Sequence, residues 1–334
     1  MRALELSAPA DVASHPLALV ERGIPEPGPD EVLVKVEVCG VCRTDLHVVE
    51  GELAPQRPAI VPGHQVVGRV ARAGSKVGPA LATGARVGVA WLHRACGRCR
   101  FCLRGDENLC TDPRFTGWHV DGGFAEYCTA AAEFVYPIPD ALPARDAAPL
   151  LCAGIIGYRA FVRSRVQRGG RLGLWGFGAS AHIVCQLARH AGVAVYAFSR
   201  APAHAEFARE LGATWVGGSF DVAPEPLDAA IVFAPAGELV PAALERLDRG
   251  ATLALAGIHM SDVPPLEYQR HLFQERSVTS VTANTRADGR ALLALAAEIP
   301  LRTRTTLYPL ARANEALVDL KEDRVRGAAV LEVG

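Results

Sequence analysis

Short alternating runs of apolar and polar residues fill the first part of the chain. The clearest run repeats valine at every second position, in a stretch rich in Val, Gly and Pro: Val32, Val34, Val36 and Val38. A period of two is typical of a strand with one buried face, and Gly and Pro mark the turns between strands. Residues 1–152 are therefore predicted to form a β-rich domain.

From residue 153 to residue 284 the pattern changes to apolar strands that alternate with Ala-rich helices. Strand-like runs at 172–175 and 193–198 flank a helical run at 183–190. This alternation predicts a doubly wound parallel sheet with helices on its faces. Each amphipathic stretch is followed by a glycine, where a positive φ commonly ends a helix: Gly192, Gly212 and Gly250.

The last segment returns to mixed character, with a predicted helix over 313–321 and a final strand over 328–333. We assign it to the first domain. A chain of 334 residues also fits two domains at roughly 150 residues each. The predicted architecture is α/β, with a β-rich domain of residues 1–152 and 285–334 and a Rossmann domain of residues 153–284.

Composition excludes several partners. Apolar residues make up 50% of the chain and charged residues 21%, which is typical of a globular protein. A formal net charge of -1 and the lack of Lys/Arg runs argue against nucleic acid, and no apolar run approaches the ~20 residues of a membrane span. No secretory pattern follows Met1, so we expect a cytoplasmic protein that acts on small molecules.

Four of the nine cysteines lie within fifteen residues and form the pattern C-x2-C-x2-C-x7-C: Cys96, Cys99, Cys102 and Cys110. Four thiolates at such spacings can close a tetrahedron around Zn²⁺, which leaves no position for a substrate. The alternatives are incidental cysteines or an iron-sulfur loop. The arginines between the ligands make a buried apolar loop improbable, so we predict a structural zinc.

Three further residues of metal-ligand type are far apart in the chain, and spacing alone would not join them: Cys42, His64 and Cys152. The runs GVCRTDLH at 40–47, PGH at 62–64 and LCAG at 151–154 resemble the zinc alcohol dehydrogenases of the medium-chain dehydrogenase/reductase superfamily. The resemblance covers nearly the whole chain. It implies a GroES-like catalytic domain in which these three residues hold a second zinc, with the fourth position open for an alcohol oxygen.

The chemistry favours a metal. Lowering the pKa of an alcohol from about 16 to about 7 requires roughly 12 kcal/mol, which no neutral hydrogen bond supplies. The resemblance implies that Thr44 hydrogen-bonds the substrate oxygen, that His47 ends a proton relay and that Asp45 orients His64. The alternative for these three is a polar turn that caps a helix.

One position departs from the family pattern, because Gln65 stands where a glutamate usually follows the histidine ligand. We expect the neutral amide to leave the metal more electrophilic but slower to exchange its ligands. Three other cysteines are predicted to bind no metal. Cys39 is a bystander near Cys42, and Cys128 and Cys185 are core residues.

A glycine-rich motif follows the strand at 172–175 and opens a helix, the context that the dinucleotide fingerprint requires. Its predicted cofactor-binding residues are Gly176, Phe177, Gly178, Ala179 and Ser180. Ala181 takes the third glycine position, which is an accepted variant. The alternative is a structural turn without a ligand.

The cofactor preference is predicted from the end of the second strand. NAD enzymes usually have an acidic residue there, whereas this chain has Ser199 and Arg200. An arginine attracts a 2′-phosphate that a carboxylate would repel, so NADP is favoured over NAD. Arg200 could instead stack on adenine or be solvated. Nearer the C terminus, Asn284, Arg286 and Arg326 are weaker candidates for nicotinamide or pyrophosphate contacts.

Aromatic residues suggest the substrate class. By resemblance, Trp91 narrows the alcohol pocket, and Trp118, Phe115 and Ile155 add to an apolar wall. Small to medium primary alcohols and their aldehydes are expected. A polyol dehydrogenase of the same fold, in which Glu commonly replaces Cys152, and a non-catalytic zinc-stabilised scaffold or sensor are the alternatives. A homo-oligomer, either a dimer or a tetramer, is also expected.

Overall fold

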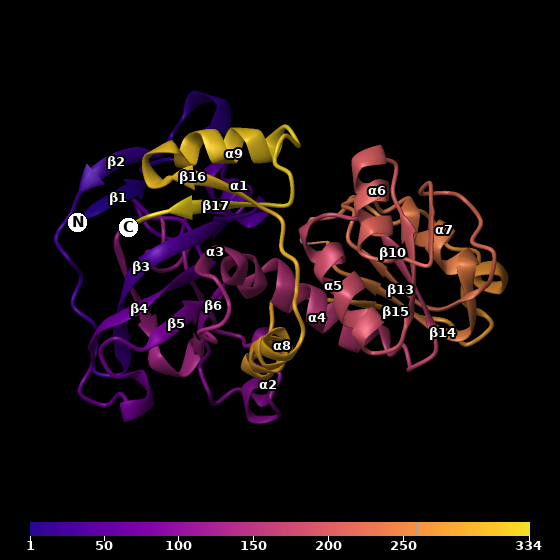
Figure 1. Cartoon of the computed structure of the whole chain (residues 1–334), viewed down its shortest axis with the longest axis horizontal. Helices are drawn as coiled ribbons and strands as arrows, with labels where there is room; N and C mark the ends of the chain where they lie inside the picture. Colours follow the sequence, from indigo (N-terminus) through magenta and orange to yellow (C-terminus); the bar gives the residue numbers. More distant parts are fainter. Residues whose placement is uncertain (258) are drawn as a thin grey trace. The chain divides into compact units, whose positions relative to one another are not determined.

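The computed structural model describes residues 1–257 and 259–334, and the chain divides into two compact units. Unit 1 contains Met1–Cys152 and Ala283–Gly334, and unit 2 contains Ala153–Thr282 (Figure 1). The first division falls where the sequence pattern changes. The second lies two residues before the expected position, because Ala283 already belongs to unit 1.

Unit 1 is built on a seven-stranded sheet. Its strands are paired in the order β16 (Thr305–Pro309), β17 (Ala328–Glu332), β3 (Glu31–Val41), β4 (Val66–Ala73), β5 (Arg86–Val89) and β9 (Val135–Pro137), and β8 (Tyr127–Ala131) also pairs with β3. All four valines of the alternating run are buried in β3, whereas Lys35 is exposed. The pairs are antiparallel except β16 with β17.

Smaller elements complete unit 1. Its two-stranded sheets are β1 (Arg2–Glu5) with β2 (Ala18–Glu21) and β6 (Leu92–Arg94) with β7 (Arg114–Phe115). Its α-helices are α1 (Arg43–Val49), α2 (Arg100–Leu103), α3 (Ala144–Ala147), α8 (Arg286–Glu298) and α9 (Ala313–Lys321). Its 3-10 helices are η1 (Val12–Ser14), η2 (Pro79–Leu81), η3 (Glu107–Leu109), η4 (Ala132–Phe134), η5 (Ala148–Leu151) and η7 (Leu310–Arg312).

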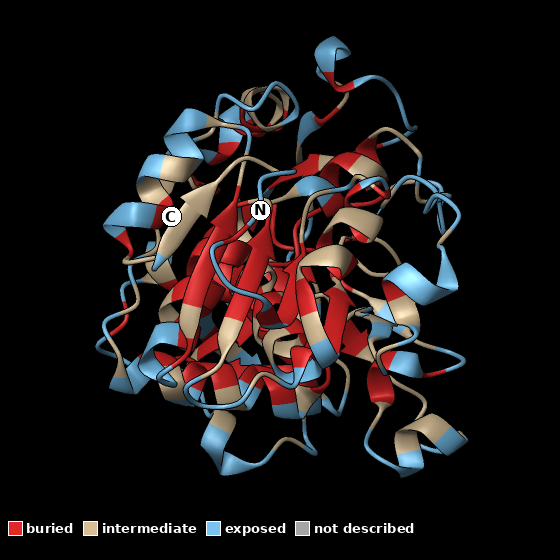
Figure 2. Ribbon diagram, turned by 90° about the vertical axis from the view of Figure 1, so that its right-hand side faces the viewer, coloured by how far each residue is buried: buried red, intermediate tan, exposed pale blue. Residues whose placement is uncertain are grey.

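Unit 2 is a parallel sheet with helices on both faces. The strand order is β12 (Trp215–Gly217), β11 (Ala194–Phe198), β10 (Arg171–Trp175), β13 (Leu227–Val232), β14 (Leu247–Leu255) and β15 (Ser277–Ser280). The helices are α4 (Ala153–Ser164), α5 (Ala179–His190), α6 (Pro202–Glu210), α7 (Leu239–Arg246) and the short π-helix η6 (Tyr268–Leu272). Numbered along the chain the order is 3-2-1-4-5-6, which confirms the Rossmann prediction; Figure 2 shows its central strands as buried.

Two of the three predicted helix-ending glycines follow a helix. Gly192 and Gly212 come after α5 and α6 with φ of 75° and 83°. Gly250 also has a positive φ, 70°, but it lies inside β14, so its predicted role was wrong. The reason is that α7 ends at Arg246 and Leu247 already pairs with Leu227 of β13.

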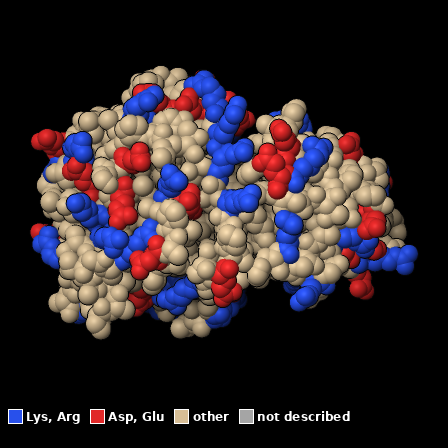
Figure 3. Space-filling view, in the orientation of Figure 1, with Lys and Arg blue, Asp and Glu red and all other residues tan. Residues whose placement is uncertain are grey.

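On the face drawn in Figure 3, basic and acidic side chains are interspersed and form no large patch of one sign. Across residues 1–257 and 259–334, no helix is both long and apolar enough to cross a membrane.

Candidate metal, cofactor and substrate sites

Cys42, His64 and Cys152 meet in unit 1 although they come from three separate segments. Cys42 lies between β3 and α1, His64 precedes β4, and Cys152 follows η5. The Sγ atom of Cys42 lies 3.3 Å from Nε2 of His64 and 3.8 Å from Sγ of Cys152, and all three ligand atoms lie within 4.8 Å of one another. Two sulfurs and one imidazole nitrogen fit zinc, with a fourth position left for substrate.

Asp45 holds two of these segments together. Its Oδ2 accepts from the backbone N–H of Cys42 at 2.8 Å, and its Oδ1 accepts from the backbone N–H of Gly63 at 3.2 Å. The same Oδ1 accepts from Nδ1 of His64 at 3.1 Å, which leaves Nε2 facing the sulfurs. A carboxylate behind the second ring nitrogen fixes the tautomer of a metal-ligating histidine.

Electrostatics around the three ligands also fit a cation. Burial alone would lower the pKa of His64, but Asp45 and Cys42 outweigh it and raise that pKa to about 10. The contact with Cys152, together with burial, raises the pKa of the Cys42 thiol. A divalent cation reverses this preference because it stabilises thiolates and a neutral imidazole.

The other residues expected near this site lie on or after α1. Thr44 is buried on its first turn, and His47 lies on its last turn with a side chain that is 16% exposed. Nδ1 of His47 contacts Oε2 of Glu52. Gln65 is buried beside Gly40, and no described residue accepts a hydrogen bond from its Nε2. Its effect on ligand exchange stays a prediction.

An aromatic wall, defined here as Trp91, Phe115 and Trp118, stands beside the histidine ligand. Trp91 packs edge-on against His64 with ring centroids 4.9 Å apart. Trp91 also stacks on Phe115 at 5.0 Å and on Trp118 at 6.0 Å. Ile155, which was expected in the same wall, is fully buried in α4 of unit 2.

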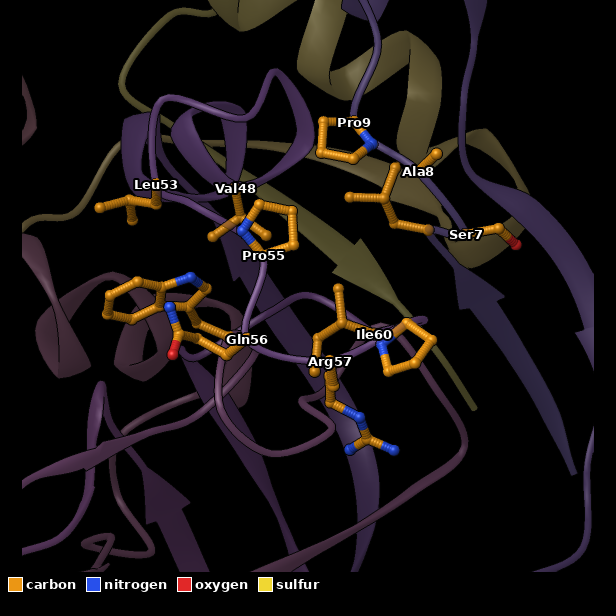
Figure 4. Close-up of a pocket in the computed structure, with 12 residues that line it drawn as sticks. Ser7, Ala8, Pro9, Val48, Leu53, Pro55, Gln56, Arg57 and Ile60 are labelled. Carbon is orange, nitrogen blue, oxygen red and sulfur yellow. The ribbon is translucent and has the colours of Figure 1, made fainter.

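An apolar cavity of about 170 Å³ borders the aromatic wall in unit 1 (Figure 4). Trp118 lines it together with Val48 of α1, Leu53 and Ile60. Nε1 of Trp118 donates to the carbonyl of Ala54 at 2.9 Å, which fixes the indole at the cavity edge. The wall therefore contacts a metal-type ligand through Trp91 and an apolar space through Trp118.

The four-cysteine cluster lies in the loop that contains α2 and η3, and its four sulfurs lie within 4.8 Å of one another. Backbone N–H groups point at the sulfurs: that of Cys96 donates to Cys110 at 3.2 Å, and that of Cys99 donates to Cys96 at 3.4 Å. Backbone N–H groups of Arg98 and Cys99 lower the pKa of the Cys96 thiol, and those of Cys102 and Thr111 lower the pKa of the Cys99 thiol, whereas burial raises the pKa of the Cys102 thiol to about 12. Amide donors around four convergent sulfurs fit a closed zinc site of thiolates.

The glycine-rich turn joins β10 to α5 in unit 2. Gly176 has φ of 83°, and Gly178 is the exposed N-cap residue of α5. No heavy atom lies within 4 Å of where a Cβ of Gly178 would be, so a ligand can approach the backbone there. The side chain of Phe177 is buried in the core, which leaves only its backbone for a ligand. Ala179 and Ser180 form the first turn of α5, and Ala181 is fully buried.

Ser199 and Arg200 follow β11, at the same edge of the sheet as the glycine-rich turn. The hydroxyl of Ser199 accepts from the backbone N–H of Ala201 at 3.3 Å. Arg200 is exposed, and none of the ion pairs found among the described residues includes it. The guanidinium is therefore available to an anion.

Two of the weaker cofactor candidates are occupied by other contacts. Asn284 is buried and donates to the hydroxyl of Tyr136 at 3.2 Å. Arg286 donates to Glu107 at 3.0 Å and to Glu133 at 3.1 Å. The ligand contacts expected of Asn284 and Arg286 stay predictions. The third, Arg326, is exposed at the end of the loop before β17.

Sequence reasoning missed two acidic contacts. Glu52, which meets His47, could have been noticed as a carboxylate one residue past Gly51 at the end of the helical run. Glu107, which is buried in η3 between two cysteine ligands and binds Arg286, gave no signal beyond its place in the loop.

Comparisons with known proteins agree with this geometry. Residues 28–140 match the model of the alcohol dehydrogenase GroES-like domain, and residues 181–298 match that of the zinc-binding dehydrogenases. A probable alcohol dehydrogenase, AdhA, of Mycobacterium tuberculosis (strain CDC 1551 / Oshkosh) is 50% identical over 335 residues, which cover 99% of this chain and 97% of that protein. An alcohol dehydrogenase of Geobacillus stearothermophilus is 34% identical, with 95% and 96% covered.

Solved structures agree as well. A cinnamyl alcohol dehydrogenase of Sorghum bicolor superimposes with a TM-score of 0.89 at 28% identity, and the match covers 98% of this chain and 97% of that one. The two-part fold and the resemblance drawn from the sequence are thus confirmed. The chain belongs to the zinc-binding alcohol dehydrogenases of the medium-chain dehydrogenase/reductase superfamily.

Proposed function

We propose that this chain interconverts small to medium primary alcohols and their aldehydes by hydride transfer, at a zinc held by Cys42, His64 and Cys152. The observation that carries the proposal is the convergence of these three ligand atoms within 4.8 Å, next to the aromatic wall. A bound zinc supplies the Lewis acidity that favours the alkoxide. The stacked aromatic rings supply an apolar surface for the carbon chain of the substrate.

Three residues of α1 support the reacting oxygen in this proposal. Thr44 is buried two residues after the ligand Cys42, where its hydroxyl can hydrogen-bond the substrate oxygen. Asp45 keeps Nε2 of His64 directed at the metal by accepting from Nδ1. His47, partly exposed on the last turn of the helix, passes the released proton toward solvent.

We also propose that Cys96, Cys99, Cys102 and Cys110 hold a second, structural zinc. All four coordination positions are taken by sulfur, so this metal would fold the loop rather than bind substrate. Both clusters require reduced thiols, which supports our prediction of a cytoplasmic location.

The proposed dinucleotide is NADP rather than NAD. The backbone of Gly176, Phe177, Gly178, Ala179 and Ser180 would receive the pyrophosphate. Ser199 and the unpaired Arg200 would meet the 2′-phosphate. The exposed Arg326 is a further proposed contact to the cofactor. Arg200→Glu should reverse the cofactor preference, and an unchanged ratio of kcat/KM for NADPH over NADH would contradict the assignment.

The proposed subunit arrangement is a homo-oligomer. β15 is an edge strand of the unit 2 sheet, and Val278 in it is 39% exposed. A free strand edge with an apolar side chain is suited to pairing with a second copy. Light scattering of the purified protein distinguishes a monomer from a dimer or tetramer.

The central test counts zinc and turnover together. Purified protein should contain two zincs per chain. It should also turn over alcohols or aldehydes with the nicotinamide cofactor, and this turnover is followed as a change in absorbance at 340 nm. Cys42→Ser should lose one zinc and nearly all turnover, whereas Cys39→Ala should keep both. Cys39 is a matched control because it is a buried cysteine three residues away that belongs to neither cluster. Two zincs without turnover on any tested alcohol would favour the scaffold or sensor alternative.

A further inference from the structure

The partly exposed His47 ends in contact with a carboxylate that neither metal cluster uses. Its Nδ1 is in hydrogen-bond contact with Oε2 of Glu52. The side chain of His47 is 16% exposed and that of Glu52 is 50% exposed. The pair therefore connects a mostly buried imidazole ring with a carboxylate that is exposed to solvent.

Backbone geometry holds this pair in place. Gly51 has φ of 82°, and a Cβ there would lie 2.8 Å from Pro9, so the chain turns sharply where only glycine fits. Directly after the turn, the backbone N–H of Leu53 donates to the carbonyl of His47 at 3.0 Å. Glu52 is thereby folded back over the end of α1.

The neighbouring glutamate is already engaged. Glu50 accepts from Nζ of Lys321 at 2.6 Å and from the backbone N–H of Val12 at 3.2 Å. Lys321 also reaches Asp11 at 3.3 Å. Of the two glutamates beside the turn, Glu52 is the one whose carboxylate meets the imidazole.

We propose that Glu52 accepts the proton that His47 releases and passes it to solvent. This inference rests on the proposed relay role of His47. During alcohol oxidation the hydride goes to the nicotinamide cofactor, and the proton of the alcohol arrives at Nε2 of His47. The Nδ1–H bond then breaks as an O–H bond forms on Glu52, and that O–H bond breaks when water or a buffer base takes the proton. The ring is left with its proton on Nε2, and proton exchange with water, which removes the Nε2 proton and returns one to Nδ1, restores the starting tautomer. Aldehyde reduction runs the same steps in reverse.

Glu52 acts through His47, so it is a positioning residue and proton acceptor rather than a catalytic residue. The amide oxygen of Glu52→Gln can still accept from Nδ1, but the amide cannot take up a proton at neutral pH. This substitution therefore separates proton transfer from holding the ring. Glu50→Gln is the matched control, because it removes the same charge from the same turn.

The test measures kcat/KM for alcohol oxidation at low and high concentrations of a small buffer base. For Glu52→Gln in dilute buffer we expect a loss of about 10-fold, below the ~100-fold or more that a direct acid or base contributes, because water can take the proton slowly. Concentrated imidazole should restore the rate. Wild type and Glu50→Gln should not respond to buffer, and Glu52→Asp should recover part of the loss.

If Glu52→Gln does not show the expected loss, His47→Gln distinguishes a failure of the Glu52 proposal from a failure of the proposed relay through His47. If His47→Gln is slow while Glu52→Gln matches wild type in every buffer, the role of Glu52 is overturned and the proposed function stands. If neither variant is slow, the relay through His47 and the role of Glu52 both fall. Zinc content and melting temperature equal to wild type confirm that each variant is folded.

Discussion

Asp45 and His64 form a buried pair in which Oδ1 of the carboxylate accepts from Nδ1 of the imidazole at 3.1 Å. The other carboxylate oxygen, Oδ2, binds the backbone N–H of Cys42 at 2.8 Å. One side chain therefore sets the ring orientation of one proposed zinc ligand and the backbone position of another.

Asp45→Asn should weaken zinc binding at the Cys42 site without emptying the four-cysteine cluster. The amide can accept fewer of the three hydrogen bonds and brings no charge, and loss of such a partner typically costs about 10- to 100-fold in metal affinity. Competition with a chromogenic chelator should release one zinc from the variant at a concentration that leaves wild type with two. Equal release from both proteins would contradict the role given to Asp45.

The four-cysteine loop should stabilise more than itself. Glu107 in this loop binds the backbone and side chain of Arg286 at the start of α8. We therefore expect Cys99→Ser to lose one zinc and to lower the melting temperature by about 10 °C, since a site that folds a loop contributes folding free energy directly. The exposed Arg98→Ala, in the same loop, should do neither. A Cys99→Ser protein with two zincs and an unchanged melting temperature would exclude a structural zinc.

Secondary structure was predicted correctly where the local hydrophobic pattern fitted only one kind of element. Alternating valines placed β3, and an apolar strand followed by glycines placed β10 and the start of α5. The pattern was wrong at Gly250, because Leu247 is apolar in register with α7 yet belongs to β14. Leu247 fits both the helical and the strand period, so the sequence pattern does not show where the helix ends and the strand begins. Pairing with β13 places Leu247 in the strand.

The two metal-type sites also differ in how far the sequence predicted them. The four cysteines of the loop are close together in sequence, so their spacing was enough to predict that their sulfurs converge. Cys42, His64 and Cys152 come from three segments that only the folded sheet and η5 bring together, so spacing held no information about them. The contact of Glu52 with His47 depends on a turn at Gly51 that packs closely against Pro9, and that packing is not visible in the sequence.

Glu31 should make stability depend on pH. The contact with His93, 3.8 Å away, and the backbone N–H of Gly28 at 3.0 Å lower the pKa of Glu31. A carboxyl whose pKa is lowered on folding adds stability above its unfolded pKa, near 4.5, and that stability is lost as pH falls through the folded pKa.

The test compares Glu31→Gln with wild type by melting temperature. The variant should be less stable by about 1 kcal/mol at pH 7, and the difference should shrink as pH falls below about 4. Glu37→Gln, on the same strand and paired with Arg69 at the surface, controls for general effects of acid such as zinc loss. A difference that stays constant from pH 7 to pH 3 would rule out the ionised Glu31 as its cause.

Trp118 should set the size of alcohol that the enzyme accepts. Its indole separates Trp91, which contacts His64, from the apolar cavity of about 170 Å³. Trp118→Ala should join that cavity to the substrate region, and additional methylene groups that become buried are each worth roughly 1 kcal/mol or more.

We therefore expect the ratio of kcat/KM for octanol over ethanol to rise at least about 10-fold in Trp118→Ala. Trp118→Phe tests the cause, because it keeps an aromatic ring but loses the hydrogen bond from Nε1 to the carbonyl of Ala54. If the ring itself is the barrier, Trp118→Phe keeps the selectivity of wild type. If the bond only holds the loop, both variants shift alike, and the cavity is then opened by loop movement rather than by loss of the indole. An unchanged ratio in Trp118→Ala would mean that the carbon chain of the alcohol leaves the metal by another route.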